Sequence, residues 1–180
     1  MVARISVGKN LYGALAYNQN KVDEGGAKVL SAHLLRYPED GRFRPDESVR
    51  QFLEWMPNHY RTEKPVIHIS LNPHPDDVLT DGQLAEIGRE YMQRLGYGNQ
   101  PYLVFKHEDI GRHHIHIVSL RVDSEGRKVS DKFEYRRSKE ITELLEQKYG
   151  LHPDIVTMAK AIAGGVPMGA MLAKDSVAAA

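Results

Sequence analysis

Two β-rich runs separated by a short polar segment constrain the fold of this chain more than any other feature. Tyr102–Phe105 and Ile115–Leu120 are rich in branched and aromatic residues, whereas residues 107–113 between them are polar. This pattern predicts an antiparallel hairpin. Strands and helices are interspersed along the rest of the chain, so we expect an α+β fold in which helices flank a central antiparallel β-sheet.

Periodicity and capping residues predict the remaining elements. Residues 66–72 predict a strand whose odd-numbered positions are apolar and whose even-numbered positions, including His68 and Ser70, are mostly polar. Thr80 and Gln83 have the spacing of a capping box, which predicts the start of a helix. The other expectations in the first half of the chain are a strand at 2–7, one or two helical turns at 11–17, a loop or a frayed helix end at 23–28, an exposed connection at 36–48 and a helix at 47–60. In the second half we expect the Thr80 helix to end at Gly96, and a further helix from Ser138 as N-cap to Tyr149 with Ile141, Leu144 and Leu145 inside.

The composition excludes several classes of protein. The 180-residue chain has 24 basic and 24 acidic side chains, so its formal net charge is zero and any nucleic-acid surface must be a local patch. The absence of cysteine excludes disulfides, thiolate nucleophiles and cysteine-based metal sites. Neither a membrane span nor the apolar core of a secretory signal is present, so we expect a cytoplasmic protein with no membrane partner.

Three of the nine histidines have a spacing that suits a metal site. His114 and His116 are two apart on a predicted strand, so they leave the same face with their Cβ atoms roughly 7 Å apart. The hairpin brings His107 back beside them, which predicts a facial three-histidine site with open positions for solvent or substrate. Asp109 is close enough in sequence to accept the free N–H of one ring. The alternative is a group of strand-surface histidines, or one hydrogen-bonded core histidine beside two exposed ones, with no common ligand.

Two further histidines are assigned differently. His113 points away from His114, so we do not expect it to be a ligand. His68 lies on the polar face of another strand, either as a neighbour of the site or as a substrate contact. Imidazole ligands without thiolate suit Mn, Zn, Ni, Co or Fe, and an open coordination face also accepts Mg. A hydrolytic site and a transesterification site both remain open at this point, the latter with Ser, Thr or Tyr as the nucleophile.

Residues of three motifs resemble the relaxases of mobilisable plasmids and transposons, which are HUH-type single-strand endonucleases. Gly13–Asn18 (GALAYN) is similar to the first motif of that family. The segment His68–Ser70, followed by the expected helix at 80–95 and by Gly96–Gly98, is similar to the second. His107, His114 and His116 fit the third motif, which binds metal. The resemblance covers about residues 3–152.

The resemblance implies an activity, a cofactor and partners. Tyr17 would attack the scissile phosphate of single-stranded origin-of-transfer DNA and form a 5′-phosphotyrosine link, with Tyr12 as the alternative nucleophile. A divalent ion, Mg or Mn first and Zn, Ni or Co as alternatives, would stabilise phosphate charge. Asp109 would orient a ligand or take the tyrosine proton. Accessory mobilisation proteins and a coupling protein are further partners of such enzymes.

Basic and polar residues predict where DNA binds. Seven basic residues lie in 121–139 against four acidic ones, and Phe133 and Tyr135 could stack on bases. A solvated hairpin and helix start is the alternative interpretation of this stretch. The predicted DNA contacts are His68, Ser70, Arg121, Arg127, Lys128, Arg136 and Arg137.

The pattern changes after Gly150. Residues 153–172 resemble the segment around the cofactor lysine of class III aminotransferases, where Lys160 would match the Schiff-base lysine. Because the chain has no room for the rest of that fold, we do not expect pyridoxal phosphate. We therefore expect a catalytic core at 1–152 and an atypical C-terminal tail at 153–180, with a short apolar helix at 155–163 and a disordered Gly/Ala-rich end.

Rival functions remain. Another HUH endonuclease, such as a replication initiator or a transposase, would share these motifs. A non-catalytic module that binds single-stranded nucleic acid would use the same sheet, with the histidines serving structure alone. An inactive fragment is the third alternative.

Overall fold

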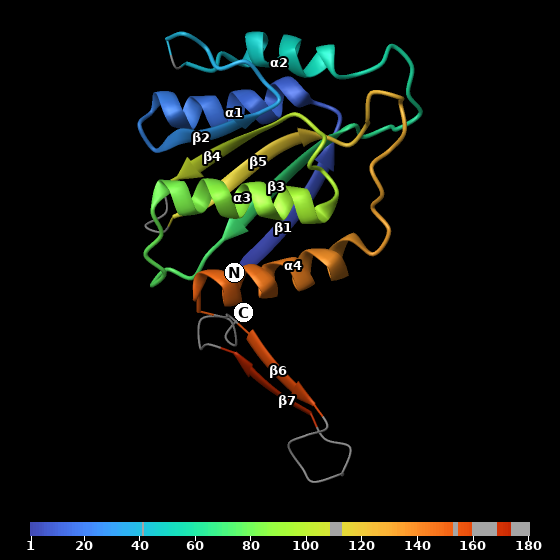
Figure 1. The fold of residues 1–180 in the computed structure, drawn as a ribbon. Helices are drawn as coiled ribbons and strands as arrows, with labels where there is room; N and C mark the ends of the chain where they lie inside the picture. The colour runs from blue at the N-terminus through green and yellow to red at the C-terminus, as the bar shows by residue number, and fades with distance from the viewer. Residues whose placement is uncertain (41, 109–112, 153–154, 160–168, 174–180) are drawn as a thin grey trace.

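A computed structural model describes residues 1–40, 42–108, 113–152, 155–159 and 169–173. One antiparallel sheet of five strands forms the centre of the fold, in the order β1–β3–β5–β4–β2 (Figure 1). Its strands are β1 (Val2–Gly8), β2 (Ala27–His33), β3 (Val66–Asn72), β4 (Tyr102–His107) and β5 (His114–Leu120). The helices are α1 (Leu11–Asp23), α2 (Pro45–Glu54), α3 (Asp81–Leu95) and α4 (Glu134–Tyr149). The predicted α+β class and the predicted antiparallel hairpin of β4 and β5 are confirmed.

The sheet lies between two layers of helices, each with its own apolar core. On one face, Ile67, Ile69 and Ile117 pack with the buried residues of α3 and α4. On the other face, Phe105 and Val118 pack with the buried residues of α1 and α2. Because side chains alternate along a strand, the histidines at 114 and 116 share the α1 face with Val118.

The third helix begins and ends as predicted. The Thr80 side chain accepts from the backbone N–H of Gln83, and the Gln83 side chain accepts from the N–H of Thr80, which completes the capping box. Gly96 ends the helix with a φ of 99°, a left-handed conformation that costs glycine little.

The expectation of a loop or a frayed helix end at 23–28 is partly wrong, because β2 already begins at Ala27. Its sequence lacks a clean alternation, and it forms an edge strand through antiparallel pairing with β4, which a local pattern does not reveal. The preceding helix is also longer than one or two turns and runs to Asp23. The α2 helix is shorter than expected and ends at Glu54, before Pro57.

The start predicted for the last helix is wrong. Phe133, in the left-handed region with a φ of 53°, precedes a helix that begins at Glu134. Ser138 is buried within the helix, and its hydroxyl forms a 2.6 Å hydrogen bond with the hydroxyl of Tyr91 rather than a cap. Leu144, expected inside, is 48% exposed, whereas Ile141 and Leu145 are buried.

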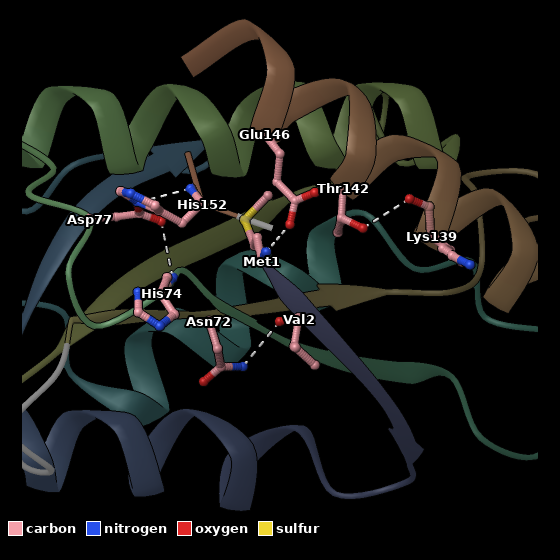
Figure 2. Close-up of polar contacts among 9 residues, drawn as sticks. All are labelled: Met1, Val2, Asn72, His74, Asp77, Lys139, Thr142, Glu146 and His152. Atoms are coloured by element: carbon pink, nitrogen blue, oxygen red, sulfur yellow. Dashed lines mark hydrogen bonds and ion pairs between the residues drawn. The ribbon is translucent and has the colours of Figure 1, made fainter. Parts of the chain in front are cut away.

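Contacts between segments far apart in sequence join the end of α4 to the sheet (Figure 2). The Asp77 carboxylate accepts hydrogen bonds from the ring Nδ1 of His152 at 2.7 Å and from its backbone N–H at 3.1 Å. The other oxygen of Asp77 accepts from the backbone N–H of His74 at 3.1 Å. Residue 152 is therefore fixed to the loop that follows β3.

The tail differs from the expected helix. Residues Ile155–Ala159 form β6, which pairs antiparallel with β7 (Gly169–Ala173). Branched residues at 155–157 favour this extended conformation. The rest of the expected helix, residues 160–163, and the Gly/Ala-rich end at 174–180 lie outside the described residues. Among the helices described, none is long and apolar enough to cross a membrane.

Candidate metal centre and nuclease site

The hairpin of β4 and β5 brings the three predicted histidines together. His107 is the last residue of β4 and pairs in register with His114, the first residue of β5. His116 follows two positions later on the same face. One ring nitrogen from each histidine lies within 4.8 Å of those of the other two. The closest rings are those of His107 and His116, with centroids 4.2 Å apart.

The donor set fits a divalent cation. His107 and His114 are buried, and His116 is partly exposed, so His116 is the member of the cluster that solvent contacts most. Three imidazoles that converge from one side form a facial set and leave the remaining coordination positions to solvent or to phosphate oxygens. Of the groups of histidine and acidic side chains in the described residues, this one alone has its donor atoms this close together.

Asn18 of α1 holds the ring of His107. The side chain of Asn18 is fully buried, and its Nδ2 donates to the carbonyl of Ala14 at 2.7 Å. That bond orients Oδ1 toward His107, where it accepts from Nε2 at 2.8 Å. The proton of His107 is thereby placed on Nε2, and the lone pair is on Nδ1, which is the nitrogen available for a metal.

Asn18 is a site residue that has no role predicted from the sequence. A signal was present, because Leu11, Leu15 and Asn18 form one helical stripe and the first two are core residues. A polar side chain in an apolar stripe must find a buried partner, and here the partner is a candidate metal ligand.

His68 of β3 holds the ring of His116 from the other side. Its Nε2 lies 2.7 Å from Nδ1 of His116, and the ring centroids are 4.8 Å apart. Burial lowers the pKa of His68, so this ring is neutral at pH 7. The hydrogen bond involves Nδ1 of His116, so Nε2 is the nitrogen of that ring that can face an ion.

Tyr17 of α1 lies beside the histidine cluster. Its ring centroid is 6.1 Å from that of His107 and 6.3 Å from that of His116, and 49% of the residue is exposed. Tyr12 is also exposed, but it forms no ring contact with the cluster among the described residues. The structure therefore brings Tyr17, and not Tyr12, next to the imidazoles.

Charged side chains pair with one another at the end of β4. Burial acts to lower the pKa of Lys106, but its bonds to Glu108 and Asp81 outweigh burial and raise it. The same Lys106 lowers the pKa of Glu108, which also lies 3.3 Å from the exposed ring of His113. His113 is not among the three clustered rings. Asp109 lies outside the described residues.

The predicted DNA contacts fall into two groups. His68 and Ser70 lie beside the histidine cluster, since Ser70 is opposite His116 in the register of β3 and β5. The basic residues follow Leu120, at the far end of β5. Leu120 lies six positions after His114 on this strand, which is about 20 Å. The basic group therefore lies at the opposite end of the sheet from the cluster.

Most of that basic group already has partners. The buried side chain of Arg121 pairs with Asp131 at 2.9 Å. Arg137 donates to the backbone carbonyls of Leu95 and Ser130. The exposed members pair with nearby carboxylates, namely Arg127 with Asp123, Lys128 with Asp131 and Arg136 with Glu140. Their positive charge is thus partly neutralised within the chain.

Comparison with curated proteins gives short matches to aminotransferases. The chain is 66% identical over 32 residues to the acetylornithine aminotransferase of Clostridium acetobutylicum, which is 18% of this chain and 8% of that enzyme. It is 59% identical over 34 residues to the acetylornithine aminotransferase of Streptococcus mutans, covering 19% of this chain and 9% of that enzyme. The chain thus spans less than a tenth of these relatives, in keeping with a resemblance confined to a minor segment.

A protein-family model matches most of the chain. The family model described as "Relaxase: MobA/VirD2-like, nuclease domain" matches residues 17–151, three quarters of the chain. The match begins at Tyr17 and includes every histidine of the cluster. It ends beside His152, the residue fixed to Asp77. With this match, and with its antiparallel sheet and clustered histidines, the chain belongs to the MobA/VirD2-like relaxase nuclease-domain family.

Proposed function

We propose that this protein nicks single-stranded origin-of-transfer DNA by transesterification, with Tyr17 as the nucleophile. The observation that carries the proposal is an exposed phenol whose ring lies about 6 Å from two rings of a three-imidazole cluster. A phenol that a DNA strand can reach, next to a cation site, is the arrangement that phosphoryl transfer to a side chain needs.

The bond changes balance without a further reactant. The phenolic oxygen of Tyr17 bonds to the scissile phosphorus, the bond from phosphorus to the 3′ oxygen breaks, and that oxygen takes a proton. The products are a 5′-phosphotyrosine and a free 3′-hydroxyl. Asp109 is proposed to orient a ligand or to accept the proton of Tyr17, as the sequence analysis expects.

The protein contributes position and protonation state. His107, His114 and His116 would hold a divalent ion, Mg or Mn first, and Zn, Ni or Co as alternatives. When bound, the ion would supply positive charge to the non-bridging phosphate oxygens. Asn18 and His68 keep two of these rings in fixed orientations.

The DNA surface is proposed in two parts. His68 and Ser70 contact the strand beside the scissile phosphate. Arg121, Arg127, Lys128, Arg136 and Arg137 form the second part, at the far end of the sheet. The exposed rings of Phe133 and Tyr135 support stacking there. Because their ion pairs must exchange for phosphate, we expect a smaller contribution from this second part than its charge suggests.

The biological setting follows from the family. The nick would start mobilisation or conjugative transfer in the cytoplasm, with accessory mobilisation proteins and a coupling protein as partners. We propose residues 1–152 as the catalytic core, supported by the contact of His152 with Asp77. Residues 153–180 form the atypical tail, for which we propose no pyridoxal phosphate site.

A denaturing gel tests the proposal. Pooled single-stranded origin sequences, labelled at their 3′ ends so that the segment held by the 5′-phosphotyrosine carries the label, are incubated with the protein and Mn²⁺, and a covalent protein–DNA adduct is expected. Tyr17→Phe should abolish the adduct while DNA binding persists, and Tyr12→Phe is the matched control. An adduct that survives in Tyr17→Phe contradicts the assignment of the nucleophile. Binding without an adduct in the unmodified protein would favour a non-catalytic module.

A further inference from the structure

A row of side chains crosses three strands beside the histidine cluster. Arg4 pairs with Ser70 in the register of β1 and β3, and Ser70 pairs with His116 in that of β3 and β5. Ala3 and Ile5 pack into the core under α3 and α4, so Arg4 between them points to the other face, where His116 lies. Two strand spacings place the Cα atoms of Arg4 and His116 about 10 Å apart.

Within the part of the chain that the structure describes, Arg4 is a cation without an internal partner. It is exposed, and within the described ranges its guanidinium forms no ion pair or hydrogen bond with the protein. Arg127 and Arg136, by contrast, are paired with carboxylates. A guanidinium left unpaired keeps its planar fork of donors for an external anion, and phosphate matches that fork.

The open half of this sheet face leads from the cluster to Arg4. Helix α1 packs against β2 and β5, so it covers one half of the face. Over β3 and β1 the face is polar and accessible, with Ser6 exposed and Ser70 and Asn72 partly exposed. A DNA strand that reaches Tyr17 and the imidazoles would therefore continue over β3 toward β1, the edge strand of the sheet.

We propose that Arg4 binds the backbone phosphate next to the scissile one, on the side of β1. This inference rests on the proposed function, and it adds a residue that sets which phosphodiester lies beside Tyr17. Since the contact is made to a phosphate that does not react, it stabilises bound DNA and the transition state alike. Loss of Arg4 should therefore raise KM and leave kcat nearly unchanged.

The first test measures binding without cleavage. Fluorescence anisotropy with a labelled single-stranded oligonucleotide is performed in the Tyr17→Phe background. Arg4→Ala should weaken binding roughly tenfold, as expected for a charge-assisted hydrogen bond. It should also reduce the slope of log K against log salt by about 0.7, the value for one phosphate contact on a single strand. Arg4→Lys should keep most of the slope, and an unchanged affinity and slope in Arg4→Ala would overturn the inference.

A charge-matched variant distinguishes a local contact of Arg4 from an effect of the protein's net charge. Arg94 lies on α3, on the opposite face of the sheet, and it is exposed beside Glu90. Arg94→Ala removes the same charge and should leave both the affinity and the salt slope at their original values. A loss equal to that of Arg4→Ala would mean that overall charge, and not a local contact, causes the effect, and the inference would fail.

The second test locates the phosphate. In the oligonucleotide that forms the adduct, a neutral methylphosphonate replaces each phosphate next to the scissile one in turn. At one of these positions it should weaken binding to the protein with Arg4 and have no further effect on Arg4→Ala, because the two changes remove one interaction. If the losses of affinity from methylphosphonate and from Arg4→Ala are additive at every position, the inference is overturned. The proposed function is unaffected by that result as long as the adduct forms. If the protein that retains Arg4 forms no adduct at all, the proposed function is overturned instead.

Discussion

Replacement of Asn18 by leucine should reduce metal affinity more than any other single change outside the three imidazoles. Leucine has a similar size and suits the stripe of Leu11 and Leu15, so packing is largely kept. The acceptor for Nε2 of His107 is lost, however, at a site where Asn18 and His107 are both fully buried. A buried N–H without an acceptor costs about 1–3 kcal/mol.

The ring of His107 can respond by moving its proton to Nδ1, which is the nitrogen that should face the ion. Removal of such a supporting contact typically weakens metal binding about 10–100-fold, and we expect a loss in this range for Mn²⁺ or Co²⁺ by isothermal titration calorimetry. Gln19→Leu is the matched control, since Gln19 is the neighbouring buried amide and bonds to Asp23 instead.

Asn18→Asp separates a ligand-positioning role from a structural one. Aspartate keeps an acceptor for His107 and should retain most of the metal affinity, although a buried carboxylate destabilises the fold in the metal-free protein. The expected order is therefore reversed between the two measurements, with leucine the more stable variant and aspartate the better metal binder. Equal metal affinity in Asn18→Leu and the unmodified protein would refute the reasoning.

Three further outcomes are expected. His114→Ala combined with His116→Ala should abolish metal uptake, as measured by metal analysis of the purified protein, and undiminished uptake would mean that the ligands are misassigned. Asp77→Asn should lower the free energy of unfolding by about 2 kcal/mol near pH 7, because charge-assisted hydrogen bonds to a buried carboxylate are lost. Burial acts to raise the pKa of Asp77, but hydrogen bonds from His152 and His74 outweigh it and lower the pKa. The stabilisation is therefore present above the unfolded value near 4 and is lost as pH falls through the lowered folded value, so denaturation curves should converge with those of Asp77→Asn in acid.

The hairpin and its histidines could be predicted because their signals are local. Alternation over residues 114–120 specifies which side chains share a face, and a tight connection specifies antiparallel pairing. Strand β2 could not be predicted in the same way, since its partner β4 lies far along the chain. The N-cap assigned to Ser138 failed for a similar reason: a hydroxyl typical of a cap is bonded to Tyr91 across the core.

Charge composition alone does not tell which cations of the predicted DNA surface are already paired within the chain. Counting Arg121 and Arg127 as available cations ignores the aspartates that fold beside them, and only the structure reveals those pairs. The opposite holds for Arg4, because a single arginine in a short strand forms no local charge pattern that could single it out. Its neighbours come from register, through Ser70 to His116, and register depends on the whole sheet.

On the proposed function, the uneven coverage of one sheet face would let a chain of zero net charge hold a phosphodiester in place. Helix α1 covers the half of the face over β2 and β5 and supplies both Asn18 and Tyr17 at the border of the covered region. On that side His107 and His114 are buried and Asn18 fixes the ring of His107, whereas His116 is partly exposed beside β3. A site at such a border combines the low dielectric that strengthens a contact with phosphate and the access that a polymer requires. Few basic residues are then needed, provided that those beside the border, such as Arg4, are not neutralised from within.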